Sequence, residues 1–201
     1  MPRDKSETNA KIITHMREEF LTYGYERASL NRISSKVGIT TAALYKHFRN
    51  KEDMFYFLVK DTLDDLREMN AAGQREMELN PAYNPFEPGY AEALVDFIYE
   101  HYEGFKLLIC CSEGSPYESF EEELIRMETE TNKEYAGLLQ DKTGRRSILT
   151  DMEWHLLSTA YIHLISEIVR HDMPKEDAKG HMEFVCRLLY PGWKELLGIK
   201  E

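Results

Sequence analysis

The stretch SLNRISSKVGITTAALYKHFRNK, residues 29–51, contains two short helical patterns joined by a tight turn. In the first pattern Leu30, Ile33 and Val37 recur at helical spacing and form one apolar stripe. Ser29 stands where a side-chain oxygen can accept a hydrogen bond from the free amides of a first helical turn. The stretch therefore predicts a helix that begins after Ser29 and ends at Val37.

Gly38 ends this helix, because a residue without a Cβ atom adopts the left-handed conformation at no steric cost. Thr40 is the N-cap of a second helix, which turns Leu44 and Phe48 inward at positions i and i+4. The outer face of this second helix carries Thr41, Ala42, Tyr45, Lys46 and His47. Two helices joined by a turn of three or four residues are typical of a DNA-binding helix-turn-helix.

The pattern also resembles, position by position, the TetR family of bacterial repressors. The matching positions are Gly24, Tyr25, Ser29, Ile33, the run Val37-Gly38-Ile39-Thr40, the run Leu44-Tyr45-Lys46-His47-Phe48, Asn50 and Lys51. The resemblance is strong over the first quarter of the chain and extends beyond it only as a layout of helices. It implies an all-α fold, with an N-terminal helix-turn-helix DNA-binding domain over residues 1–50 and a C-terminal helical ligand-binding and dimerisation domain over residues 51–201.

The second helix and its flanks supply the predicted DNA contacts. We expect Thr41, Ala42 and Lys46 to face base edges, because they lie on the outer side of the recognition helix. Hydroxyl and cationic groups at the ends of that helix fix its register on the phosphates. A cation at a helix N-terminus opposes the helix dipole, which indicates a phosphate beside Lys51. The expected phosphate contacts are Thr40, Tyr45, His47 and Lys51, and Asn31 is expected to add a contact.

The distribution of charge favours a nucleic-acid partner for the N-terminal part only. The whole chain has a net charge of −11. Residues 1–51 nevertheless hold ten Lys and Arg against five Asp and Glu, a net of +5, whereas the remaining 150 residues hold 15 against 31, a net of −16. Because a basic surface is what attracts phosphate, this asymmetry indicates that the N-terminal part alone meets DNA.

The remaining apolar periodicity predicts helices throughout the chain. A helix over residues 7–23 is ended by Gly24, and a long helix capped by Asn50 runs to about residue 78. Three prolines within residues 79–89 exclude a regular helix there. Further helices are predicted over residues 90–111, where Gly104 leaves open whether one helix or two form, and over residues 116–138, 151–171 and 174–197. Thr150 and Glu153 form a capping box, which is a specific helix start.

The C-terminal part carries no motif of a known catalytic chemistry. A Walker loop, a nucleophile elbow, an HExxH and a dinucleotide-binding GxGxxG are all absent from the sequence. We therefore expect neither enzyme activity nor a cofactor. Aromatic and Met side chains on its helices most simply fill a core, but the resemblance implies that the same helices enclose a pocket for a small, mainly apolar ligand. The expected ligand-binding residues are Phe97, His101, Phe105, Met127, Thr131, Trp154, Leu157 and Tyr161.

The last two predicted helices each carry an apolar stripe that one small domain has few ways to cover. We expect both to pair with their symmetry mates as a four-helix bundle in a homodimer. Two recognition helices related in this way match half-sites about 34 Å apart or a multiple of it, so the double-stranded DNA operator is expected to be palindromic. The expected interface residues are Ile165, Ile168, Val185 and Leu189.

The cysteines, histidines and apolar runs bear on three questions, namely the state of the thiols, metal binding and cellular location. Cys110, Cys111 and Cys186 lack CxxC spacing and are expected to be reduced core residues, with a redox-sensing Cys110–Cys111 pair as the alternative. Four histidines in the last two helices are 8, 8 and 10 residues apart, which is not the spacing of two metal ligands on one helix face, so no metal site is expected. Neither a membrane-spanning run nor a secretory signal appears, so a cytoplasmic location without a membrane partner is expected.

The sequence thus predicts a TetR-like transcriptional regulator, namely a homodimeric repressor that a small-molecule effector releases from its operator. Two alternatives stay open. One is a constitutive DNA-binding protein whose C-terminal part only dimerises, and the other is a helical enzyme with an appended DNA reader. The residues leave the effector, the operator sequence and the regulated genes unidentified.

Overall fold

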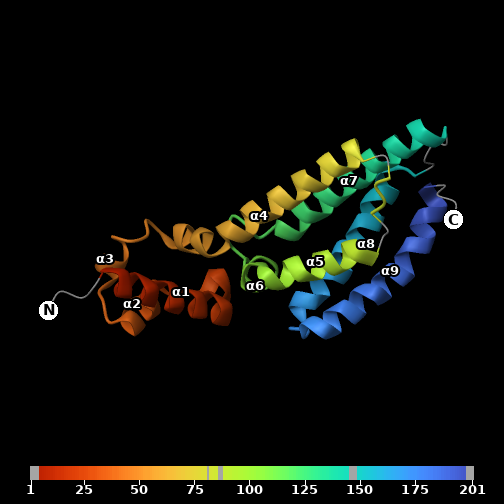
Figure 1. Ribbon diagram of the computed structural model, residues 1–201. Coiled ribbons are helices and arrows are strands. Elements are labelled where there is room, and N and C mark those ends of the chain that lie inside the picture. The colour runs from red at the N-terminus through yellow and green to blue at the C-terminus, as the bar shows by residue number, and fades with distance from the viewer. Residues whose placement is uncertain (1–4, 81, 86–87, 145–148, 198–201) are drawn as a thin grey trace. The chain divides into compact units, whose positions relative to one another are not determined.

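The computed structural model describes residues 5–80, 82–85, 88–144 and 149–197, and over these residues the chain forms α-helices and no β-strand. The predicted all-α fold class is confirmed, and Figure 1 labels the helices. The chain divides into two compact units. We call residues 1–66 and 103–119 the head unit, and residues 67–102 and 120–201 the body unit.

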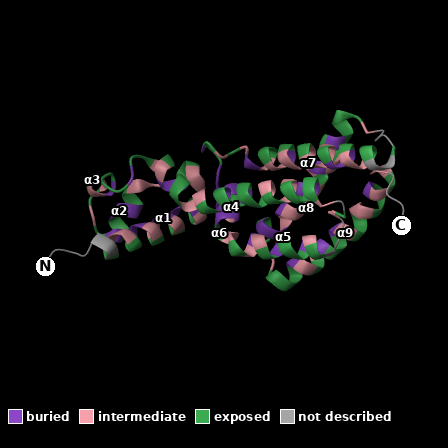
Figure 2. Ribbon diagram, turned by 45° about the horizontal axis from the view of Figure 1, so that its top comes forward, coloured by how far each residue is buried: buried purple, intermediate pink, exposed green. Residues whose placement is uncertain are grey.

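The head unit is built around an aromatic core. It consists of α1 (Lys5–Arg27), α2 (Leu30–Val37), α3 (Thr41–Leu44), α4 (Lys51–Leu79) as far as residue 66, and α6 (Tyr102–Cys110) from residue 103. The Phe20 ring meets the Phe55 ring edge-on, with 5.2 Å between centroids, and both rings contact Tyr25. The purple side of these helices in Figure 2 is the buried side, and its fully buried apolar residues include Ile12, Met16, Ile33 and Leu44.

The head unit extends beyond the domain predicted over residues 1–50, because a later segment of the chain completes its core. The amide of Tyr25 donates a hydrogen bond to the carbonyl of Cys111 over 2.7 Å. The ring of Phe55 stacks on Tyr117 with 6.1 Å between centroids. Contacts so distant in sequence leave no periodic signal, so residues 103–119 could not be assigned to this unit from the sequence.

Gly104 does not break a helix. The predicted helical segment forms two helices, α5 (Pro88–Glu100) and α6, and the break between them lies at His101. Gly104 is helical and buried, and it permits a close approach to α4. A Cβ atom at Gly104 would lie 1.9 Å from Oγ1 of Thr62. The absence of a side chain at this position is therefore a packing requirement of the head unit.

The body unit contains α5, the rest of α4, α7 (Phe120–Thr143), α8 (Asp151–Arg170) and α9 (Lys175–Leu197). Helix α8 packs against α7, and α9 packs against both α5 and α8. Met77, Tyr135 and Trp193 are buried together and form the centre of what we call the aromatic cluster. Its partly buried members are Tyr83, Leu138, Leu139, Leu157, Tyr161, Tyr190 and Leu197.

Most predicted helix limits in the body unit agree with the structure. The capping box is present, because the Thr150 hydroxyl accepts from the Glu153 amide and the Glu153 carboxylate accepts from the Thr150 amide. Helix α4 ends at residue 79, close to the predicted residue 78. Helix α9 contains Pro191, which the sequence interpretation overlooked, and continues to residue 197. Pro191 has no amide to donate to the helix. The packing of Trp193 in the aromatic cluster stabilises the last turns of α9 and offsets this loss.

Candidate nucleic-acid interface

The turn between α2 and α3 has the predicted geometry. The Ser29 hydroxyl accepts a hydrogen bond from the Arg32 amide over 3.4 Å, and the Thr40 hydroxyl accepts one from the Ala43 amide over 3.1 Å. Gly38 has a φ of 75°, and its amide donates to the carbonyl end of α2. Both N-caps and the left-handed C-cap are therefore confirmed, and they hold the two helices in a fixed relation.

Glu19 on α1 anchors the start of α2, and the sequence interpretation did not single it out. Its side chain is fully buried. Its Oε1 accepts hydrogen bonds from the Ser29 amide at 2.8 Å and from Nε of Arg32 at 2.7 Å. Arg32 also donates to the carbonyl of Arg27. Hydrogen bonds to an ionised group are about twice as strong as neutral ones, so this carboxylate fixes the helix-turn-helix on α1.

The second helix is shorter than predicted. It covers only Thr41–Leu44, and residues 45–47 form a turn. The amides of Lys46 and His47 donate to carbonyls three residues earlier, the pattern of a tightened helix end. Leu44 and Phe48 are buried, as their spacing predicts. Lys46 and His47 are both exposed in this turn, as expected for DNA contacts.

Most predicted DNA contacts are exposed on α2, α3 and the following turn. The hydroxyl of Thr41, which is half-buried, donates to Oδ1 of Asn31 at 2.8 Å and lies 3.2 Å from the Ser34 hydroxyl. In the free protein these two predicted contacts therefore hold α3 against α2, and a base or phosphate must replace their mutual hydrogen bond. The exposed residues of the predicted set are Asn31, Thr40, Ala42, Tyr45, Lys46 and His47.

Lys46 differs from the neighbouring cations. Arg32, Lys36 and Arg49 each form an ion pair with a carboxylate of the head unit. Within the described part of the chain, no acidic side chain pairs with Lys46. Its ammonium group can therefore meet DNA without first breaking an internal contact.

Lys51 makes contacts within the protein. A phosphate was expected beside it because a cation opposes the dipole at a helix start, and these contacts offer another explanation for the cation. Its Nζ donates to the carbonyls of Glu26 at 2.9 Å and Ala28 at 3.3 Å, and it lies 4.7 Å from the centre of the Tyr25 ring. Burial lowers the pKa of Lys51. These contacts join the end of α1 to the start of α4, which accounts for a cation at the start of a helix.

We expect Lys46→Ala and Lys51→Ala to have different effects. Loss of Lys46 should reduce the slope of log affinity against log salt by about one unit per subunit, because one cation no longer displaces a counterion. Loss of Lys51 leaves two carbonyls without their donor and should lower the free energy of unfolding by about 1–2 kcal/mol. Fluorescence anisotropy at several salt concentrations and urea unfolding measure the two quantities. An equal change of salt slope in both variants would instead support the predicted phosphate contact of Lys51.

The structure separates the predicted ligand-binding residues. Phe105 is buried in the head unit, whereas the other seven residues belong to the body unit. The rings of Phe97 and His101 contact each other, with 4.8 Å between centroids. Leu157 and Tyr161 pack instead on the aromatic cluster. Trp154 is buried, and Met127 and Thr131 are half-buried on α7, the helix that α8 packs against.

Polar groups that the sequence did not single out connect α7 to α8. Nδ2 of Asn132 donates to Oε1 of Glu128 at 3.0 Å and lies 3.4 Å from the hydroxyl oxygen of Ser158 on α8. The sequence held one signal for Glu128, namely its spacing from Tyr135. Glu128 lies seven residues before Tyr135 and is therefore on the same side of α7. The body unit thus combines a ring-lined core with a small polar network.

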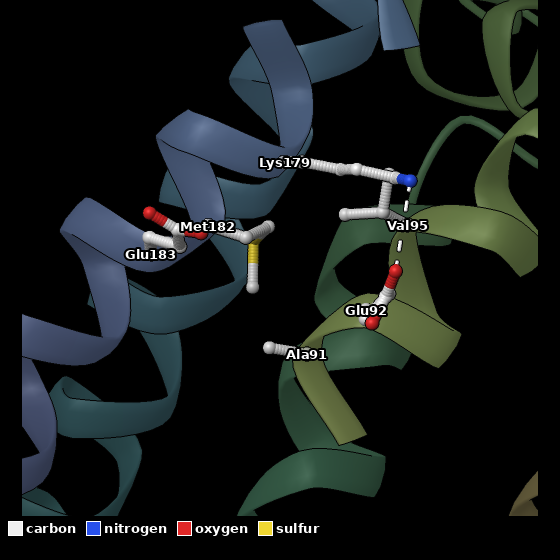
Figure 3. Close-up of a pocket in the computed structure, with 6 residues that line it drawn as sticks. All are labelled: Ala91, Glu92, Val95, Lys179, Met182 and Glu183. Carbon is white, nitrogen blue, oxygen red and sulfur yellow. Dashed lines mark ion pairs between the residues drawn. The ribbon is translucent and has the colours of Figure 1, made fainter. Parts of the chain in front are cut away.

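A pocket of about 170 Å³ lies between α5 and α9 in the body unit, and Figure 3 shows its lining. Lys179 and Glu92 form an ion pair across it at 3.6 Å. The volume is smaller than the roughly 300–1,000 Å³ of typical ligand sites. Its lining consists of Ala91, Glu92, Val95, Lys179, Met182 and Glu183, none of which was predicted to bind the ligand.

Helices α8 and α9 each present exposed apolar side chains. Met152 and Leu156, one turn apart on α8, are 63% and 57% exposed. Phe184 and Leu188, one turn apart on α9, are 55% and 57% exposed. Large apolar side chains at such positions favour contact with a partner.

The residues predicted for the dimer interface need correction. Ile168 and Val185 are fully buried within the body unit, so they have no surface to offer a partner. Ile165 and Leu189 are half-buried. Periodicity identifies which positions share a stripe, but it does not tell which stripe faces the protein's own core.

The cysteines differ in burial, and only one of them fits the expected core position fully. Cys111 is buried, and burial raises its pKa, whereas Cys110 is exposed and Cys186 is intermediate. Among the described residues, no group of three or more His, Cys, Asp and Glu side chains could hold a metal ion. The described helices are also too short or too polar to cross a membrane.

Sequence comparison finds relatives of the N-terminal region. Residues 12–56 match the family model described as bacterial regulatory proteins, tetR family. Over 64 residues the chain is 34% identical to an HTH-type transcriptional regulator of Staphylococcus aureus (strain USA300), and this match covers 32% of the chain and 35% of that protein. The chain therefore matches about a third of the length of its curated relatives.

Comparison with solved structures extends the likeness to the whole fold. NalD of Pseudomonas aeruginosa, described as the secondary repressor of the MexAB-OprM multidrug efflux pump, has a TM-score of 0.59 and 20% identity, with 92% of this chain and 96% of that chain covered. A TetR-like transcriptional regulator from Rhodococcus sp. RHA1 has a TM-score of 0.58 and 16% identity, with 97% and 98% covered. At these identities the likeness is one of fold.

Proposed function

Because residues 12–56 match the model of the TetR family, we propose that the chain is a transcriptional repressor of that family, which binds a palindromic DNA operator as a homodimer and is released by a small molecule. The observation that carries the proposal is the exposed run Tyr45-Lys46-His47 beside a helix-turn-helix with both N-caps in place. In this position of a helix-turn-helix, Lys46 can reach base edges in the major groove while Tyr45 and His47 contact phosphates. We place the protein in the cytoplasm, with DNA and an effector as partners and no membrane.

The charge of the head supports DNA as its partner. Residues 1–51 carry a net charge of +5 in a chain of net charge −11. The basic character is thus concentrated beside the reading helix, where phosphate contacts supply much of the affinity. The acidic remainder disfavours a second DNA-binding surface.

Selection of bound duplexes from a random DNA pool tests the proposed DNA reading. We expect a palindromic consensus with half-site centres about 34 Å apart, or a multiple of it. Lys46→Ala should relax the preference at one base pair by ~1–3 kcal/mol. Enrichment of a single, non-palindromic site would contradict the dimer, and no enrichment at all would contradict the repressor.

We propose that the exposed stripes of α8 and α9 form the dimer interface. Met152 and Leu156 on α8, and Phe184 and Leu188 on α9, are exposed in the protomer although they are large and apolar. Their burial against a symmetry mate would remove this surface from water. The pairing of two helices from each subunit corresponds to the predicted four-helix bundle, with its contacts moved to the exposed side.

Leu156→Glu is expected to convert the dimer to a monomer of 23.6 kDa at micromolar concentration. A carboxylate buried at an apolar interface without a partner loses its solvation, which a standard interface cannot offset. Sedimentation velocity measures the change. The matched control is His155→Glu, which places the same charge on the adjacent exposed residue of α8 and should leave the dimer intact. A wild-type monomer under these conditions would contradict the assembly.

We propose that the effector binds in the body unit. The aromatic cluster supports this, because ring faces with a few polar groups suit a mainly apolar organic ligand. A coupling of ~1–3 kcal/mol between effector and operator would change operator affinity roughly 5- to 150-fold. The measurement is operator affinity with and without a compound found by thermal-shift screening. A screen in which nothing raises the melting temperature favours the constitutive DNA-binding protein, and formation of a product favours the enzyme.

A further inference from the structure

Three polar side chains meet where α2 packs against α3. Thr41, the first residue of α3, donates its hydroxyl proton to Oδ1 of Asn31 at 2.8 Å. The Thr41 oxygen also lies 3.2 Å from the hydroxyl oxygen of Ser34. Ser34 in turn donates to the backbone carbonyl of Asn31 at 3.1 Å. The hydroxyl of Thr41 therefore has two neighbouring side-chain oxygens on α2.

Ser34 is the buried member of this group, and the sequence interpretation did not single it out. It is only 4% exposed, whereas Asn31 is exposed and Thr41 is half-buried. Buried polar groups are almost always hydrogen-bonded, because they have lost their contacts with water. A serine inside a helix can donate to the carbonyl three or four residues earlier, as Ser34 does. The proton of Ser34 is therefore already used, and its oxygen remains available as an acceptor.

The number of protons in the group determines the direction of the Thr41 hydroxyl. Ser34 and Thr41 contribute one hydroxyl proton each, whereas the carbonyl oxygen and Oδ1 of Asn31 only accept. Both protons make internal hydrogen bonds when Thr41 donates inward. If the Thr41 proton turned outward, Oδ1 of Asn31 would lose its donor and the group would lose one internal hydrogen bond. The inward direction is therefore favoured.

The same direction is favoured when Asn31 turns to DNA. A contact between DNA and the amide group of Asn31 breaks its hydrogen bond with Thr41, so the Thr41 proton needs another acceptor. The oxygen of Ser34 lies 3.2 Å away, and rotation of the Thr41 O–H bond alone directs the proton to it. Ser34 thus allows Asn31 to contact DNA while the Thr41 hydroxyl stays hydrogen-bonded within the protein.

An inward proton decides which groups of DNA Thr41 can bind. The outer side of its oxygen then presents only lone pairs, which require a hydrogen-bond donor. Phosphate oxygens, N7 and O6 of guanine, N7 of adenine and O4 of thymine are all acceptors, so none of them is suitable. The donors of the major groove are the exocyclic amino groups of adenine and cytosine. The favoured partner of Thr41 is therefore a base amino group and not the DNA backbone.

We propose that Ser34 is a positioning residue, which keeps the Thr41 hydroxyl as an acceptor on the reading surface, so that Thr41 recognises the amino group of an adenine or a cytosine. The position of Thr41 on the outer side of the recognition helix gives no direction for its hydrogen bond. Ser34 supplies that direction from beneath. The inference deepens the proposed function and rests on its DNA reading, but it does not depend on the effector or on the dimer interface.

Modified bases test which group of the operator is read. The duplex is the consensus that the wild type selects from the random pool, with one base replaced in each half-site. In place of adenine, 2-aminopurine moves the amino group from the major to the minor groove, and 2-pyrimidinone in place of cytosine removes it. A 7-deazapurine in the same base pair removes the N7 acceptor instead and leaves the amino group in place. Fluorescence anisotropy gives the ratio of affinities for the unmodified and modified duplexes.

Thr41→Val identifies the position that Thr41 reads, because valine keeps the shape of the side chain without the hydroxyl. At one position of each half-site, loss of the amino group should weaken wild-type binding by about three- to tenfold, which corresponds to one hydrogen bond. The same loss should weaken Thr41→Val by less than about twofold. Removal of N7 at this position should change the affinity of wild type and Thr41→Val by the same factor, because Thr41 does not donate to it.

The decisive variant is Ser34→Ala, which keeps Thr41 but removes the acceptor beneath it. The Thr41 proton can then turn outward, so loss of the amino group at the same position should weaken this variant by less than about twofold. The matched control is Ser35→Ala, which removes an exposed hydroxyl from the adjacent residue of α2 and should keep the wild-type ratio.

The ratio of affinities separates positioning from a structural role of Ser34. A general loosening of the helix-turn-helix would weaken both duplexes alike and leave the wild-type ratio unchanged. An unchanged ratio in Ser34→Ala, or an equal loss of the ratio in Ser35→Ala, would therefore overturn the role of Ser34.

The remaining outcomes concern Thr41 and the proposed function. A Thr41-dependent effect of N7 in place of the amino group would overturn the acceptor, and this measurement needs no substitution of Ser34. A selected consensus in which no amino group depends on Thr41 would overturn the inference and leave DNA reading by other residues intact. Selection that enriches no duplex would contradict the DNA reading itself, and the inference with it.

Discussion

Glu19→Ala is expected to lower the free energy of unfolding of the head unit by about 3 kcal/mol, and DNA affinity should fall with it. The buried carboxylate accepts from the Ser29 amide and from Arg32. Its removal leaves an amide and a guanidinium with unmet hydrogen bonds beside a cavity. Because the anchored residues begin α2, the whole helix-turn-helix loses its fixed position on α1.

The neighbouring Glu18→Ala is the matched control. Glu18 is exposed and pairs with His15 and Lys36 at the surface, so its loss should leave unfolding unchanged within error. Far-UV circular dichroism in urea follows all helices, whereas tryptophan fluorescence follows the body unit, which contains Trp154 and Trp193. Equal destabilisation by both variants, or a change confined to the fluorescence transition, would refute the role of Glu19.

Gly104→Ala is expected to destabilise the head unit by about 3 kcal/mol, although alanine is the better helix former. The added methyl would lie 1.9 Å from Oγ1 and 2.8 Å from Cβ of Thr62, so the two helices must move apart. The change is measured by the urea midpoint of the circular dichroism transition.

Two further variants isolate the cause. Thr62→Ala combined with Gly104→Ala should recover part of the loss, because it removes Oγ1 but leaves the close Cβ atom. Gly137→Ala on α7 meets no atom within 4 Å and should stabilise the protein by about 0.5–1 kcal/mol. A destabilising effect of the same size at Gly137 would mean that the loss at Gly104 is not a clash with Thr62.

Local features of the fold were predictable from the sequence. Ser29, Gly38, Thr40 and the Thr150–Glu153 pair act within one helical turn of themselves, so their residue types predict their conformations. The long helix that ends in a proline-rich segment is likewise a local effect. Such caps and breaks determine where helices begin and end, and these limits agree with the structure.

Features that depend on long-range packing were not predictable. Glu19 lies on the same stripe as Ile12 and Met16, yet only the approach of Arg32 explains why a carboxylate belongs there. The reason for Lys51 is a pair of carbonyls more than twenty residues earlier. Of the four residues predicted for the interface on α8 and α9, Ile168 and Val185 are buried within the protomer, because residue choice requires knowledge of which side the body unit already covers.

The candidate sites also include features that a local pattern predicts and features that depend on long-range packing. Exposure on the reading surface follows from a short local pattern, and six of its eight predicted residues are exposed. The predicted ligand residues depend on how five helices pack, and Phe105 lies in the other unit from the remaining seven. Glu128 and Asn132 were not predicted, because polar residues on a helix with many charges do not stand out by composition.

The discontinuous head unit has a consequence for synthesis on the ribosome. The nascent chain presents α1 to α4 first, but the segment that contacts Tyr25 and Phe55 does not emerge until residues 111–117 have been made. At ~5–20 residues per second, translation from residue 67 to residue 119 takes roughly 3–10 s, during which the head lacks part of its core. A prematurely terminated chain that ends in α5 would therefore carry an incomplete reader. Translation itself thus couples completion of the head unit to the prior synthesis of α5, a helix of the body unit.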